Sequence, residues 1–331
     1  MKLISYQVNT QDGPKVRIGA VQGSNAIDLS AAYRLELLAR GLNSNAAERL
    51  ASALLPGDMV AFIENGEAGL DAAQVAISAA VKKGYETGPN NETIIFPLED
   101  AKLLSPITRP PMLRDFMAFE THLKNIYPKL GKEIPPEWYE MPAYYKGNPS
   151  SLSTHGDEIP MPSYAQELDF EFELAIIIGR GGKNIPREDA LSHVFGYTIY
   201  NDFSARKIQS KEIAIGLGPS KGKDFTNGHT LGPWIVTADE IPDIYNMAMK
   251  AKVNNEVWCD DNSGSIYWKF EDLVAHASMG EYLQVGEVLG TGTIGWGSGA
   301  EREKFLYPGD EVELEVEGIG ILKNRIVAEN S

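Results

Sequence analysis

The sequence predicts an α+β protein with two domains, and the change of pattern along the chain predicts both. Residues 1–105 alternate strand-like and helix-like segments, which indicates a small N-terminal α/β domain. Residues 106–331 are richer in short strand-like segments. Between them, SPITRPP (105–111) carries three prolines and is typical of a linker, so we place the domain boundary there.

The elements follow from local periodicity. In the N-terminal domain, KVRIGAVQ (15–22) alternates and predicts a strand, while the apolar spacing of 31–42 and 70–83 predicts two helices. The larger domain should begin with a Pro-interrupted loop at 127–142, which is long enough to be a lid. After it we expect a strand at 167–178, a helical segment near 186–194 and a strand at 195–200. A helix beginning near Asn201 and several short strands should follow.

Composition excludes several classes of protein. The apolar fraction is 43% and the charged fraction 23%, as in soluble globular proteins, and no apolar run is long enough to span a membrane. The net charge of -16 repels nucleic acid and anionic membranes. Cys259 is the single cysteine, which excludes an intrachain disulfide and a thiolate zinc cluster. With no apolar signal-peptide core at the start, we expect a cytoplasmic protein.

The segment ELDFEFELAIIIG (167–179) poses a charge problem. It places Asp169, Glu171 and Glu173 at every second position and then becomes apolar on both faces, as in a covered central strand. GDEVELEVEG (309–318) alternates in the same way but is typical of a half-exposed strand with its glutamates in water. Two carboxylates about 4 Å apart repel by roughly 4 kcal/mol at an effective dielectric constant of 20. Near a buried strand they must hold protons, pair with Arg or Lys, or bind a hard cation such as Mg²⁺, Ca²⁺ or Mn²⁺.

Two further segments could complete a cation site. Asp202 lies where a predicted strand turns into a helix, and Arg206 and Gln209 would follow it on one helical face. Asp115 and His122 are seven residues apart and would share a face if their segment is helical. The alternative for both segments is a surface helix with solvated charges. A metal site would consist of Asp115, Glu171, Glu173 and Asp202.

Other motifs carry less weight. GTGTIG (290–295) fits a dinucleotide-binding pattern, but no apolar helix follows it, and GPSKGKDF (218–225) lacks the spacing of a phosphate-binding loop. We expect His193 to be a packed residue of its helical segment. His155 and His229 lie in loop-like segments without an evident partner.

Taken together, the motifs resemble the fumarylacetoacetate hydrolase family over residues 105–328. They are, in order, RDF followed by His122, E-x-E before an apolar strand, NDFSAR-x-IQ, LGPSKGKDF, GTGTIG, FLYPGDEVE and GIGIL. The resemblance implies a mixed β-sandwich roll in the C-terminal domain, a homodimer, and a divalent metal ion, Mg²⁺, Mn²⁺ or Ca²⁺. The N-terminal region is similar to the family's variable small domain only loosely.

The resemblance also implies roles for single residues. It makes Asp115, Glu171, Glu173 and Asp202 the metal ligands, and it places Lys223 beside the metal to polarise the substrate. His122 corresponds to the general base, with Glu301 as the carboxylate that orients it. Tyr145, Arg206, Gln209 and Thr293 match positions that contact the substrate. Asp169 has no implied role, and we expect its removal to be milder than that of the ligands.

The implied reaction is hydrolysis of a carbon–carbon bond in an anionic β-diketo acid of the fumarylacetoacetate or acylpyruvate type, by water that His122 activates. One alternative is a metal-dependent isomerase, decarboxylase or hydratase of a 2-oxo acid, which needs no attack of water on a diketone. Another is a non-catalytic Ca²⁺- or ligand-binding protein. The His122–Glu301 pair discriminates the first two, because only hydrolysis requires it, and metal binding without turnover of any candidate substrate would indicate the third.

Overall fold

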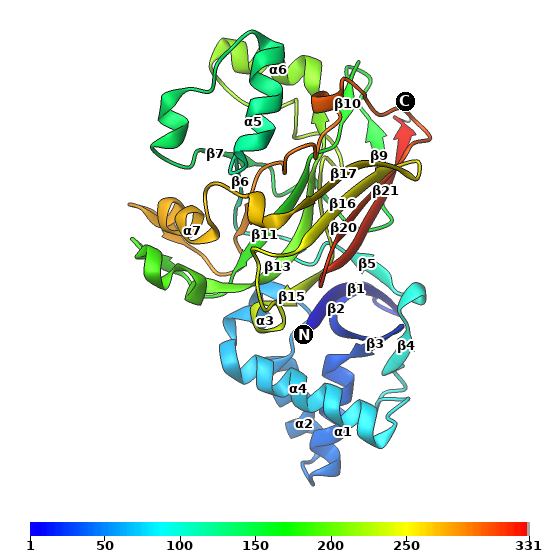
Figure 1. The fold of residues 1–331 in the computed structure, drawn as a ribbon. Coiled ribbons are helices and arrows are strands. Elements are labelled where there is room, and N and C mark those ends of the chain that lie inside the picture. Colours follow the sequence, from blue (N-terminus) through cyan, green and yellow to red (C-terminus); the bar gives the residue numbers. More distant parts are fainter. Residues whose placement is uncertain (330–331) are drawn as a thin grey trace.

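The computed structural model describes residues 1–329 and is built on a large mixed sheet to which both parts of the chain contribute (Figure 1). Its strand order is β4-β3-β2-β1-β15-β13-β11-β19-β6-β7, with β5 beside β1 and β8 beside β15. The bounds are β1 Lys2–Thr10, β2 Gly13–Gln22, β3 Asn25–Asp28, β4 Ile95–Pro97, β5 Lys102–Leu104, β6 Leu113–Phe116, β7 Tyr144–Gly147, β8 Leu152–Ser153, β11 Phe172–Ile178, β13 Val194–Asp202, β15 His229–Thr237 and β19 Val288–Gly290. Because β1 pairs with β15, the N-terminal strands extend the sheet of the larger part. The domain boundary near residue 105 stays a prediction.

A second mixed sheet packs on one face of the first and forms the predicted sandwich (Figure 1). Its order is β17-β16-β20-β21-β9, with bounds Glu256–Asn262, Ala248–Val253, Glu311–Val316, Gly320–Ala328 and Glu158–Met161. In β20, Val312, Leu314 and Val316 are buried while Glu311 and Glu315 are exposed, which confirms the predicted half-exposed strand. Two short ladders join β10 (Leu168–Asp169) to β14 (Ser204–Ala205) and β12 (Gly182–Lys183) to β18 (Tyr282–Leu283).

The helices form two groups. Those of the N-terminal part pack together at one end of the molecule (Figure 1): α1 Leu29–Ala39, α2 Ser44–Leu54, α3 Met59–Glu64 and α4 Gly66–Lys83. The larger part carries α5 Glu120–Ile126, α6 Arg206–Ile215 and α7 Phe270–Ser278. The helices predicted at 31–42 and 70–83 are confirmed as α1 and α4. In residues 1–329, none of the helices combines the length and the apolar character needed to cross a membrane.

Strand β11 runs through the middle of the large sheet, between β13 and β19. Phe172, Leu174 and Ile176 face the core between the two sheets, and Ala175 and Ile177 belong to the core that includes the N-terminal helices. The strand is therefore buried on both faces, as its apolar continuation predicted. Carboxylates at its beginning enter the interior of the protein.

Two local predictions are wrong, because strand pairing overrides helical spacing. The helix expected near Asn201 begins at Arg206, since residues 201–205 pair with β15 and β10. Asp202 therefore ends a strand and shares no helical face with Arg206 or Gln209. Asp115 and His122 likewise lie in different elements, β6 and α5. The helical segment predicted near 186–194 is confirmed, and it is a 3-10 helix, Arg187–His193.

The loop predicted at 127–142 is confirmed, while its role as a lid stays a prediction. The segment 127–142 contains two short 3-10 turns, Tyr127–Leu130 and Pro136–Tyr139, and no longer helix or strand. Trp138 anchors the second turn, because its indole N–H donates to Met117 O at 2.7 Å and its ring packs against Tyr267. The loop is thus attached to the chain that follows β6.

Candidate metal centre

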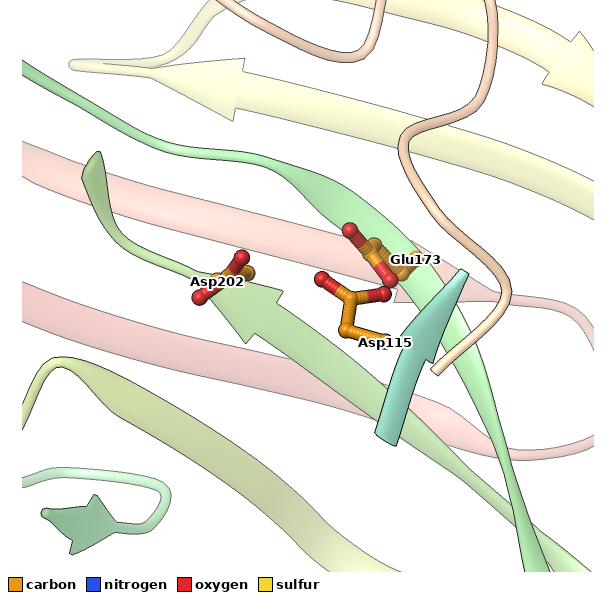
Figure 2. Close-up of side chains that lie close together, drawn as sticks. All are labelled: Asp115, Glu173 and Asp202. Carbon is orange, nitrogen blue, oxygen red and sulfur yellow. The ribbon is translucent and has the colours of Figure 1, made fainter. Parts of the chain in front are cut away.

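Three buried carboxylates from three strands meet near the end of the large sheet. Asp115 comes from β6, Glu173 from β11 and Asp202 from the end of β13, and one oxygen of each lies within 4.8 Å of the others. Figure 2 shows the three side chains directed into the same space. Between β11 and β6 lies Gly290 of β19, where a Cβ would come within 2.7 Å of Asp115 Oδ1. A larger residue there would crowd both the Asp115 carboxylate and the ring of Tyr200.

The glycine-rich segment GTGTIG supports this cluster instead of binding a nucleotide. Gly292 donates its N–H to Glu173 Oε2 at 2.8 Å. Its φ is +81°, and a Cβ at this position would lie 2.4 Å from Phe116 O, so that only glycine fits. Thr293 is buried in the same segment. The backbone of this glycine-rich segment therefore comes close to the carboxylate of Glu173.

The donor set fits a hard divalent cation. Asp115 Oδ1 and Glu173 Oε1 are buried without a hydrogen-bond partner among the described residues, and both belong to the three-carboxylate group. Buried acceptors without partners are costly, and an all-oxygen group is the kind that Mg²⁺, Mn²⁺ or Ca²⁺ prefers. Asp115, Glu173 and Asp202 could therefore hold a divalent ion.

Charge repulsion in the cluster is visible in its protonation equilibria. Burial, and then the neighbouring Asp202, raises the pKa of Asp115 well above its ordinary value. Burial, and then Asp115, raises the pKa of Glu173 in the same way. Both shifts have the direction that repulsion among close, buried carboxylates produces, and a bound divalent ion would oppose this repulsion and favour the ionised carboxylates.

Glu171 lies beside the cluster and joins two cations. The ammonium of buried Lys223 contacts both Glu171 Oε2 and Asp202 Oδ2. Arg206 Nη1 lies 2.8 Å from Glu171 Oε1. Although burial opposes ionisation, Arg206 and then Lys223 lower the pKa of Glu171 to about 2. Glu171 is not one of the three converging carboxylates, and its role as a fourth ligand stays a prediction.

His122 and Glu301 are brought together from α5 and from the turn Ala300–Arg302. The Nδ1 of His122 lies 3.1 Å from Glu301 Oε2, although the two groups are not in line for a hydrogen bond. Glu301 is fixed by four other donors: Trp296 N at 2.8 Å, Asn125 Nδ2 at 2.8 Å, and both N and Oγ of Ser298 at 3.1 Å. Burial opposes its ionisation, but His122 lowers the pKa of Glu301 below its ordinary value.

Three of the positions expected to contact substrate lie against the charged side chains of the site, and they are Tyr145, Arg206 and Gln209. Tyr145 of β7 donates its hydroxyl to Asp202 Oδ2 at 2.7 Å, and its ring lies near the Lys223 ammonium. Gln209 Oε1 accepts from Arg206 Nη1 at 3.1 Å. Contact of these residues and of Thr293 with a substrate stays a prediction.

His229 is a residue of the site that the sequence interpretation missed. It is fully buried at the start of β15, and its Nδ1 lies 2.7 Å from the Tyr200 hydroxyl and 3.0 Å from Asp202 Oδ1. Its Nε2 lies 3.2 Å from Asp224 Oδ1. The apolar run that begins after it, TLGPWIV, was the available signal that this histidine enters a buried strand.

Comparison with known proteins identifies the family. Residues 112–327 match the family model described as fumarylacetoacetate (FAA) hydrolase, C-terminal. An uncharacterized protein of Staphylococcus aureus (strain USA300) is 36% identical over 231 residues, which are 69% of this chain and 72% of that protein. The chain belongs to the fumarylacetoacetate hydrolase family.

Solved structures of this family share the fold. Maleylpyruvate hydrolase from Sphingobium sp. SYK-6, in complex with manganese(II) ion and pyruvate, aligns with a TM-score of 0.71 at 22% identity over 100% of both chains. The 5-carboxymethyl-2-hydroxymuconate delta-isomerase from Mycobacterium smegmatis aligns with a TM-score of 0.65 at 23% identity over 99% of this chain and 100% of that chain. At these identities the likeness shows the fold. Fumarylacetoacetate hydrolase family membership indicates an enzyme, and the carboxylate cluster gives it a place for a divalent metal.

Proposed function

We propose that this protein is a divalent-metal-dependent hydrolase that cleaves a carbon–carbon bond in a β-diketo acid of the fumarylacetoacetate or acylpyruvate type. The observation that supports it most is the pairing of buried His122 with Glu301 in a protein that also holds the three-carboxylate cluster. A histidine oriented by a carboxylate is the arrangement that a water-activating base requires. A reaction that proceeds through an enolate without attack of water requires only the carboxylate cluster and its neighbouring cations, and it does not require this base.

We further propose Asp115, Glu173 and Asp202, with Glu171 as the fourth, as ligands of Mg²⁺, Mn²⁺ or Ca²⁺. When bound, such an ion supplies Lewis-acid polarisation of a substrate carbonyl. The maleylpyruvate hydrolase of similar fold was solved with manganese(II) and pyruvate, which supports both an ion of this type and a 2-oxo acid product.

The protein's own residues would then divide the work. A carboxylate at Nδ1 favours the imidazole tautomer protonated there, so that Nε2 of His122 is free to take a proton from water. The resulting hydroxide adds to the carbonyl carbon, the carbon–carbon bond breaks, and its electron pair remains on the departing fragment as an enolate that takes up a proton. The buried ammonium of Lys223 stabilises the negative charge that develops on oxygen. Tyr145, Arg206, Gln209 and Thr293 would orient the substrate.

A substrate panel tests this function. Acylpyruvates, fumarylacetoacetate and oxaloacetate are incubated with the protein and Mg²⁺ or Mn²⁺, and loss of diketo absorbance is followed before and after EDTA. Loss that depends on the metal supports the hydrolase if it releases a carboxylic acid together with an oxo acid, which is a 2-oxo acid from an acylpyruvate and a 3-oxo acid from fumarylacetoacetate. Absence of loss on every diketo acid, with the protein folded and the metal bound, contradicts it.

The second candidate is an isomerase, decarboxylase or hydratase of a 2-oxo acid. The delta-isomerase from M. smegmatis, which aligns over the whole of its length, favours it. Substituting His122 by Ala separates the two candidates, because only hydrolysis requires the base. If H122A keeps turnover within a few-fold while E173Q abolishes it, the second candidate replaces the first.

We also propose that the protein is a homodimer in solution. Light scattering coupled to size-exclusion chromatography, run with and without Mg²⁺, checks this directly. A mass of twice the single chain supports the proposal, and the mass of one chain at micromolar concentration contradicts it.

A further inference from the structure

Asp169 is fully buried at the end of β10, and donors saturate its carboxylate. Oδ1 accepts the N–H groups of Phe170 at 2.9 Å and Gly299 at 2.7 Å. Oδ2 accepts Ala300 N at 2.9 Å and Arg206 Nε at 2.8 Å. An ionised carboxylate has about four lone-pair sites, so none is left for a metal ion. Consistently, Asp169 is not part of the three-carboxylate group.

The donors of Asp169 come from the two halves of the site. Gly299 and Ala300 directly precede Glu301, the partner of His122. The loop sits tightly on the carboxylate, because a Cβ at Gly299 would lie 2.6 Å from Asp169 Oδ1. On the other side, Arg206 extends past Asp169 to Glu171 Oε1. One side chain therefore joins the loop of the base pair to the cations of the carboxylate cluster.

We propose that Asp169 is a positioning residue that holds the Glu301 loop against Arg206 and so sets the place of the His122–Glu301 pair relative to the cluster. It touches neither substrate nor metal. Its removal would leave the amides of buried Gly299 and partly buried Ala300 without this acceptor and would release the loop from Arg206. The kinetic part of this proposal rests on the proposed function, and the structural part does not.

Asp169→Asn is the test variant, and Asp28→Asn is its matched control. Asp28 is also buried, accepts a backbone N–H from Ala31 and pairs with Arg17, but it lies in the N-terminal part. Hydrogen–deuterium exchange of peptides spanning 296–304 is measured in both. Asp169→Asn replaces one of the two acceptor oxygens by an NH2 group that only donates, so exchange of at least one of the Gly299 and Ala300 amides should speed by about tenfold or more, and D28N should not change it. Exchange equal to that of the unchanged protein overturns the proposal.

Calorimetric titration with Mn²⁺ separates positioning from ligation. The Mn²⁺ Kd of Asp169→Asn should stay within about threefold of that of the unchanged protein, because Asp169 does not contact the ion. Glu173→Gln, which removes a ligand, should raise the Kd by about thirtyfold or more. Loss of Mn²⁺ affinity in D169N as severe as that in E173Q would make Asp169 a ligand and the proposal wrong. Neither this measurement nor the exchange depends on turnover.

A double-mutant cycle with Glu301→Gln tests the route through which Asp169 acts. On the best substrate of the panel, D169N should lower kcat by about ten- to a hundredfold with little change in KM. In the E301Q background, D169N should lower kcat much less, because the loop that Asp169 holds no longer carries the Glu301 carboxylate. Full additivity of the two effects contradicts positioning through Glu301. If neither the unchanged protein nor any variant turns over any substrate, only the proposed function is contradicted. Hydrogen–deuterium exchange and Mn²⁺ affinity still decide the role of Asp169.

Discussion

Glu301 Oε2 lies 3.1 Å from Nδ1 of His122, and the two residues come from a short helix and a turn far apart in the sequence. Donors from Trp296, Ser298 and Asn125 hold the carboxylate, so its position does not depend on the histidine. The carboxylate that would orient the base is therefore in place before any substrate binds. The predictions below ask first whether the pair is used.

Glu301→Gln should lower kcat by about 10²- to 10⁴-fold, the usual contribution of a positioned general base, because the amide cannot stabilise the imidazolium. Metal affinity should not change. Glu303→Gln is the matched control, since Glu303 is two residues away, exposed, and pairs only loosely with Lys129. Steady-state kinetics on the best panel substrate measure both variants. Similar kcat values in E301Q and E303Q would remove the base pair from the mechanism.

Divalent metal should stabilise the folded protein by relieving repulsion among Asp115, Glu173 and Asp202. At a free ion concentration of 100 times the Kd, the gain in unfolding free energy is about 2.7 kcal/mol. Glu173→Gln should abolish the metal-induced rise of Tm and leave the metal-free Tm equal or higher, because one buried charge is gone. Differential scanning fluorimetry with Mn²⁺, Mg²⁺ and EDTA provides the measurement.

The control for this prediction is Glu287→Gln. Glu287 is as buried as Glu173 but pairs with Arg114 at 2.9 Å, away from the cluster. Its loss should lower the free energy of unfolding by about 3 kcal/mol, and therefore lower Tm, but the metal-induced rise of Tm should remain. If E173Q lowers the metal-free Tm as E287Q does, the cluster carries no repulsion for a metal ion to relieve.

The sequence predicted the carboxylate cluster because burial is local information. Glu173 stands before a run that is apolar on both faces, and that run is the central strand β11. It did not predict the elements that bring Asp202 and Asp115 to it. Spacing of four and seven residues fits a helix, whereas pairing of residues 201–205 with β15 and β10 is information held elsewhere in the chain.

The roles of Asp169 and His229 were hidden for a related reason. Asp169 alternates with the two glutamates and looked like a third member of their face, yet its partners, Gly299 and Ala300, lie far along the chain. His229 had no partner in sequence, and in the fold it meets Asp202 across the β13–β15 pairing. Partners supplied by tertiary contacts leave no periodic trace in the sequence.

Glu281 should contribute to stability in a pH-dependent way. Hydrogen bonds from Arg114 lower the pKa of Glu281 to about 2 from an ordinary value of 4.5. Its folded-state pKa is depressed, so its contribution is present above about pH 4.5 and is lost as the pH falls toward 2. The stability difference between the unchanged protein and E281Q should therefore be constant above pH 5 and shrink between pH 4.5 and pH 3. Urea unfolding across this range measures it, and a difference that stays constant down to pH 3 contradicts the ion pair.

Cys259 should report on opening of the sandwich core. The thiol is buried between the sheets and donates to Gly295 O at 3.5 Å, and burial, followed by Asp261, raises its pKa to about 12. Only the thiolate reacts with disulfide reagents, so the native protein should resist labelling at pH 8 and react fully in urea. Since a bound metal stabilises the folded state, Mn²⁺ should slow labelling of the native protein, and E173Q should abolish this slowing. Rapid labelling without denaturant would show that this part of the core is open, and equal slowing in E173Q would show that the metal acts elsewhere.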